Sequence, residues 1–141
     1  MSWLDERIQQ AREREERSKS ITNGAPDLYV SLWTEIVKIV EEAKRKRIPV
    51  FTNGTEIDRI VSFGAHDVYE SRQPLRQIHL NLGKDKPSIN VSGDISITFS
   101  VDLCPDNIVC LKEKDKQIST RDAAIRIMDQ FLFPELYNPT T

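Results

Sequence analysis

The fold of this chain is decided by residues 89–103, which read INVSGDISITFSVDL. Apolar side chains occupy every odd position of this stretch except Gly93, and polar side chains occupy the even positions. Because side chains alternate across a β-strand, the segment has one apolar face and one polar face. The pattern predicts a half-buried antiparallel sheet as the centre of the protein.

This stretch is too long to be one strand of a small domain, since it would extend for about 50 Å. A hairpin at Gly93-Asp94 solves the problem. A three-residue loop of 93–95 keeps Val91 beside Ile97, whereas a two-residue loop would place Val91 beside Ser96 and mismatch the faces. The sequence therefore favours the longer loop, or a bulge.

Strands are also expected on both sides of this hairpin. Asn53-Gly54 is a strong turn signal, and it predicts a hairpin between 48–52 and 55–63. Residues 64–74 read as a polar loop, 75–82 as the next strand and 83–87 as a turn. A turn through 104–107 leads to a last strand at 107–112, and a charged connector follows at 112–116.

Helices are expected at both ends of the chain. Ser2 and Asp5 have the spacing of a capping box and begin a helix over residues 2–22, whose apolar stripe fades into mixed charge. The sequence of 22–26, which ends in Pro26, predicts a break, with Asp27 capping a broad amphipathic helix over 28–46. Ser119 is expected to cap a final helix that ends at Pro134.

The grouping of the strands between helices predicts an α+β fold. We expect an antiparallel meander of five to six strands, covered on one face by helices from both ends of the chain. The 141 residues fit a single domain, 1–141. Its α+β core would span 27–133, with the charged helix 2–22 as an extra element and 134–141 as a flexible tail.

Composition limits the partners and the compartment. The net charge is −2, so no overall field attracts nucleic acid, and the basic run 44–47 reads as the end of a helix. No membrane span and no signal peptide is expected, which predicts a cytoplasmic protein. In the expected hairpin Leu103 faces Ile108, which aligns Cys104 poorly with Cys110 and predicts two free thiols.

Motifs of catalysis are missing from the sequence. It contains no Gly-x-Ser-x-Gly elbow, no phosphate-binding loop and no dinucleotide-binding glycine pattern. The Cys-x5-Cys spacing and the distant His66 and His79 do not fit a zinc site. His66-Asp67 reads as a solvated loop pair. We expect no catalytic residue, metal or cofactor.

Two functions remain as hypotheses. The leading one is a binding module, in a homodimer or with a protein partner, that uses Trp3, Leu4 and Ile8 as its contact. The stripe of these residues is too thin for an internal core element and too apolar for a free helix. The alternative is a small-ligand-binding protein or an enzyme that uses the polar sheet face. Its candidate residues are His79, Asn81, Ser96, Thr98 and Ser100.

Overall fold

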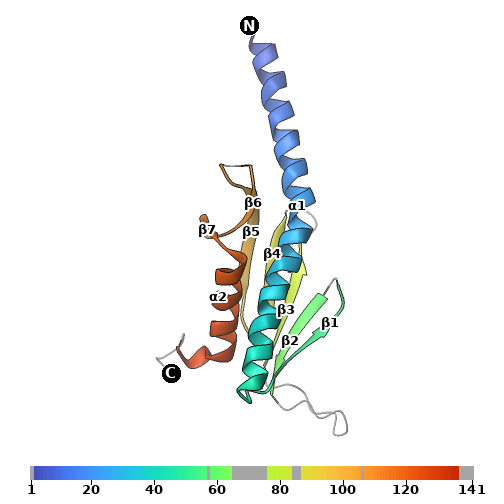
Figure 1. The fold of residues 1–141 in the computed structure, drawn as a ribbon. Helices are drawn as coiled ribbons and strands as arrows, with labels where there is room; N and C mark the ends of the chain where they lie inside the picture. Colours follow the sequence, from blue (N-terminus) through green and yellow to red (C-terminus); the bar gives the residue numbers. More distant parts are fainter. Residues whose placement is uncertain (1, 57, 65–75, 84–86, 106, 137–141) are drawn as a thin grey trace.

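The structure is a computed structural model that describes residues 2–56, 58–64, 76–83, 87–105 and 107–136. A long helix and a shorter one lie on one side of a seven-stranded sheet (Figure 1). The elements are α1 Trp3–Arg45, β1 Val50–Gly54, β2 Asp58–Phe63, β3 Arg76–Leu82, β4 Ser88–Gly93, β5 Ile97–Leu103, β6 Val109–Glu113, β7 Lys116–Ile118, α2 Thr120–Leu132 and the 3-10 helix η1 Pro134–Leu136.

The sheet is an antiparallel meander in which each strand pairs with the next in the chain, from β1 to β7. The α+β class and the register of the central hairpin are confirmed, because Val91 pairs with Ile97 and Ile89 pairs with Phe99. The strand count is higher than the expected five to six.

The additional strand lies where the sequence predicted a charged connector. Residues 112–116 form a tight hairpin, in which Glu113 pairs with Lys116. The two turn residues, Lys114 and Asp115, have φ values of 50° and 67°. Positive φ at both central positions is typical of a type I′ turn, which usually carries Asn or Gly, so Lys-Asp gave no turn signal.

The first hairpin turns later than predicted. Asn53 and Gly54 are both paired, Gly54 with Arg59, and the turn follows them. It is closed by a hydrogen bond from the Thr55 amide to the Asp58 carbonyl oxygen, 2.9 Å. Gly54 keeps a positive φ of 104°, so the glycine is needed for its backbone conformation at the start of the turn.

The predicted break at 22–26 is wrong, because α1 is continuous and Pro26 lies inside it. The helix continues because its buried face is uninterrupted: Ala25, Tyr29 and Leu32 face the core, while Pro26 is exposed. Asp27 is therefore an interior helical residue and not a cap. The predicted caps at the true helix ends are confirmed, since Ser2 accepts from the Asp5 amide and Ser119 from the Asp122 amide.

Gly24 allows α1 to approach the sheet closely. A Cβ atom built on Gly24 would lie 2.6 Å from Cγ2 of Val109 in β6. Real Cβ contacts of that length essentially do not occur, so a side chain here would force the helix and the strand apart. The glycine that reads as a helix stop is thus a packing residue.

The core lies between the sheet and the two helices. One face of α1 and one face of α2 cover the apolar side of the sheet, as the sequence predicted. The largest fully buried side chains are Phe99, Phe131, Leu32, Ile36, Ile78, Leu80, Ile89, Leu111, Ile127 and Met128.

The expectation of two free thiols is wrong, because Cys104 and Cys110 form a disulfide with a Cα–Cα distance of 6.2 Å. The expected register of this hairpin was shifted by one residue: Leu103 pairs with Val109. A one-residue shift exchanges the two faces of a strand. Cys110 consequently pairs with Asp102 on the face away from the helices, within reach of Cys104.

Some sequence predictions concern residues outside those described. They are the loop 65–74 with His66 and Asp67, the middle of the turn 83–87 and the tail 137–141. In the part of the chain that is described, no helix combines the length and the apolar character needed to cross a bilayer.

Candidate functional site

The polar face of the sheet holds one cluster around Asp58, at the start of β2. Nδ1 of His79 lies 3.1 Å from Oδ2 of Asp58, and Nδ2 of Asn81 donates to Oδ1 of Asp58 over 3.4 Å. The register explains the cluster, because Asp58 pairs with Asn81 and Ile60 with His79. Asp58 was missed in the sequence, since only the strand pairing places it beside His79.

The other predicted residues of the polar face lie apart from this cluster. Thr98 in β5 donates to Oδ1 of Asn90 over 3.3 Å, and Ser100 donates to the Lys112 carbonyl oxygen over 3.4 Å. Ser96 is exposed in the β4–β5 turn. Strand β4 separates β5 from β3, which implies a spacing of about 10 Å. The five predicted ligand-binding residues thus do not converge on one point.

The second candidate region is the N-terminal half of α1, which projects beyond the end of the sheet (Figure 1). All residues from Ser2 to Ser20 are exposed. The exposed fraction is 74% for Trp3, 52% for Leu4 and 44% for Ile8. The helix therefore does not fold back to bury the predicted contact residues on its own sheet.

The exposed apolar residues continue the stripe that forms the core. Leu4, Ile8 and Ala11 recur at spacings of four and three residues, as do Ala25, Tyr29 and Leu32. This is the spacing of one helix face. Between the two groups the same face carries polar side chains, at Glu15, Ser18 and Thr22. The stripe thus has one segment covered by the sheet and a distal segment that no described residue of the chain covers.

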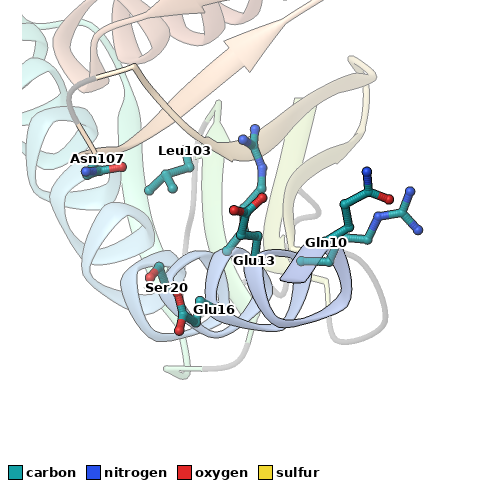
Figure 2. A pocket seen from close by; sticks show the side chains of 8 residues that line it. Gln10, Glu13, Glu16, Ser20, Leu103 and Asn107 are labelled. Carbon is teal, nitrogen blue, oxygen red and sulfur yellow. The ribbon is translucent and has the colours of Figure 1, made fainter. Parts of the chain in front are cut away.

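A hollow of about 600 Å³ lies between the projecting helix and the β5–β6 hairpin. Figure 2 shows Gln10 and Glu13 on the helical side of this hollow, with Leu103 and Asn107 opposite them. The remaining lining residues are Arg14, Glu16, Arg17 and Ser20. Most of the lining is charged or amide-bearing, which suits a polar protein surface better than an apolar ligand.

Asp102 ties the projecting helix to the sheet. Its carboxylate accepts from Nη2 of Arg17 at 2.7 Å and from Nζ of Lys112 at 3.0 Å. The Leu103 amide also donates to it, over 2.7 Å. These hydrogen bonds, that of the Leu103 amide first, lower the pKa of Asp102 to about 2. Among the residues that the structure describes, Arg17 is the one residue of the segment 2–20 that forms an ion pair with the sheet.

The structure agrees with the interpretation of the basic run 44–47 as the charged end of a helix. Nζ of Lys44 lies 3.6 Å from Glu41 Oε1, and Nζ of Lys46 lies 3.7 Å from Glu42 Oε1. Both pairs are within the last turns of α1, where cations favour the helix dipole. This partial neutralisation gives no support to nucleic-acid binding.

Comparisons with protein-family models, with curated proteins and with solved structures found no match. Among the described residues there is no group of three His, Cys, Asp or Glu side chains that could hold a metal ion.

Proposed function

We propose that the protein acts by binding and that it self-associates through the projecting N-terminal half of α1. The observation that carries the proposal is the exposure of Trp3, Leu4 and Ile8 on a helical segment that is exposed along its whole length. Burying what remains exposed of such side chains stabilises an assembly by about 1–2 kcal/mol each, because part of each is already covered in the single chain.

The helical state of this segment also needs an explanation. A helix without packing contacts is marginal in water, although the capping box at Ser2 and many strong helix formers favour it here. Growth from the packed half of α1 removes the cost of nucleation. Packing against a second helix would supply the remaining stabilisation.

The charges of the segment favour a second copy in antiparallel orientation. Residues 2–20 have a formal charge of zero, with five acidic residues (Asp5, Glu6, Glu13, Glu15, Glu16) and five basic residues (Arg7, Arg12, Arg14, Arg17, Lys19). Two copies therefore do not repel each other. An antiparallel pair brings residues 2–7 of one copy, with a net charge of −1, toward residues 8–20 of the other, with a net charge of +1.

The test is the molar mass in solution, measured by size-exclusion chromatography with light scattering. We compare the wild-type chain with Ile8→Ser and with a matched control, Ile125→Ser. The control position is on α2 and is 45% exposed, against 44% for Ile8. Both variants remove the same side chain from an exposed helical site.

The wild-type chain and the control variant are expected to be dimers, and Ile8→Ser is expected to weaken the dimer by about tenfold or more. Equal dimerisation of both variants would show that another surface is used. A wild-type chain that stays monomeric at high concentration would contradict self-association and leave a different protein as the occupant.

A second candidate function, a ligand-binding or catalytic polar face, is favoured by the contact between Asp58 and His79. An Asp beside Nδ1 orients the imidazole and leaves the other nitrogen for proton transfer. Ser92 of β4 pairs with His79 in the register and carries a hydroxyl. If no small molecule shifts the His79 ring signals in NMR spectra, this candidate is removed.

The cytoplasmic location stays a prediction, and the disulfide weighs against it. Disulfides persist in oxidising compartments and are rare in the cytosol. The proposed self-association does not depend on the compartment.

A further inference from the structure

A second hollow, of about 680 Å³, lies between α1, strand β2, the end of β3 and Pro87, which precedes β4. Its volume is within the range of small-molecule sites. It is separate from the polar face around His79 and from the hollow in Figure 2. Its lining residues are Ser18, Thr22, Ala25, Pro26, Tyr29, Val30, Glu56, Arg59, Leu82, Gly83 and Pro87.

Arg59 is the one basic residue among these. It lies on β2 opposite Leu80, on the face of the sheet that α1 covers. Its guanidinium carbon is 5.4 Å from the ring centre of Tyr29 and 5.4 Å from that of Trp33. Both rings therefore lie within cation–π distance of the guanidinium and restrict its position.

The guanidinium lacks an anionic partner among the described residues. No ion pair of Arg59 is found there, and its Nε is buried without a hydrogen-bond partner. A buried donor without a partner is costly, and in native structures such a group needs an explanation. A ligand carboxylate would give the guanidinium the anionic partner that it lacks, because guanidinium and carboxylate form two parallel hydrogen bonds.

The walls on either side of Arg59 are apolar. Pro26, Leu82 and Pro87 present carbon atoms to the hollow, and so does Val30, which is 50% exposed. The Tyr29 hydroxyl is already used, since it donates to the Leu80 carbonyl oxygen over 2.7 Å. Tyr29 therefore contributes its ring as a wall.

From this arrangement we infer that the hollow binds a small organic carboxylate with an apolar body, whose carboxylate pairs with Arg59. The apolar part lies along α1 against Val30, Leu82 and Pro87. A single negative charge suits the site better than a phosphate dianion, because Arg59 is the one cation among the described lining residues and Glu56 is also present. Arg59 and the apolar wall lie outside the segment 2–20 proposed for self-association, with which the hollow shares Ser18.

The experiment uses decanoate as the probe and decanol as its uncharged counterpart. Binding is measured by titration calorimetry and by the fluorescence of Trp33, which contacts Arg59. The fluorescence is read in a Trp3→Phe chain, because Trp3 and Trp33 are the two tryptophans of the protein. We expect saturable binding of decanoate with a change in Trp33 emission, and binding of decanol at least about tenfold weaker.

Three variants locate the carboxylate. Arg59→Gln is expected to weaken decanoate binding by about tenfold, and Glu56→Gln is expected to strengthen it by about twofold, since a repelling charge is removed. Arg76→Gln is the matched control, because Arg76 also stacks on aromatic rings, those of Phe63 and Phe131, and does not line the hollow. Decanoate affinity should be unchanged in this variant.

The inference is overturned if decanoate does not bind at millimolar concentration, or if decanol binds equally well. It is also overturned if Arg59→Gln and Arg76→Gln have the same effect. Thermal melting of each variant shows whether it is folded. The comparison of decanoate with decanol and the Glu56→Gln variant decide the question even if Arg59→Gln does not fold.

Discussion

Asp102 shows how one side chain links two elements and makes their contact depend on pH. Its carboxylate accepts from the Leu103 amide, from Lys112 in β6 and from Arg17 in α1, and these contacts favour the ionised form. The pKa of Asp102 is lowered from 3.8 to about 2. The stabilisation is therefore fully present above pH 4 and is lost as the pH falls toward 2.

We expect Asp102→Asn to lower the free energy of unfolding by about 1 kcal/mol at pH 7, since the side chain is partly exposed and its ion pairs are screened. The difference from wild type should shrink to less than half of its pH 7 value by pH 2, where about half of the wild-type carboxylates are protonated. Urea unfolding between pH 2 and pH 7 measures both effects. Asp27→Asn, on the exposed side of α1, is the control, and an equal pH profile for both variants would contradict the assignment.

At the residue scale, the sequence predicts what depends on near neighbours. The Ser2 and Ser119 caps are local, because the amides they accept from are three residues away. The contacts of the candidate sites are not local: Arg17 and Asp102 are 85 residues apart, and Asp58 and His79 are 21 apart. No spacing rule joins such residues before the strand order and register are known.

Gly24 and Val109 determine how closely α1 approaches β6. We expect Gly24→Ala to destabilise the protein by about 1–3 kcal/mol, although alanine is the better helix former, because its Cβ would overlap the Val109 side chain. Removing the obstacle with Val109→Ala should restore part of the stability in the double variant. Urea unfolding of the four proteins gives the coupling energy, and strictly additive effects would show that the two residues do not touch.

At the scale of elements, packing overrode local signals. Gly24 and Pro26 are typical of helix ends, but the contacts of Ala25 and Tyr29 with the core keep α1 continuous through both. The β6–β7 turn differs, because there the local signal is missing. Lys114 and Asp115 adopt positive φ, although neither residue type predicts such a turn. The alternation of 89–103 was stronger than either kind of signal, so the central hairpin and its register could be predicted.

The whole molecule has two parts with different exposure. The sheet, α2 and the C-terminal half of α1 share one apolar core, whereas α1 is about 65 Å long and its N-terminal half extends beyond that core. Alternation and periodicity predict the covered face of the sheet. They do not predict whether the N-terminal segment projects or folds back, because a thin apolar stripe can pack equally well on its own domain or on a second copy.

Thermal melting of the full chain and of residues 21–141 distinguishes packing of the segment on its own domain from packing on a second copy. Residues 2–20 are exposed, and among the described residues their ion pair with the sheet is Arg17–Asp102. Their removal should therefore lower the free energy of unfolding of the isolated monomer by less than about 1 kcal/mol. At low protein concentration the two chains should therefore melt within about 4 °C of each other. Self-association makes the melting temperature depend on protein concentration. The melting temperature of the full chain should therefore rise with concentration, while the melting temperature of 21–141 stays constant. A shortened chain that is much less stable at every concentration would mean that the segment packs on its own domain, and a constant melting temperature for the full chain would contradict the dimer.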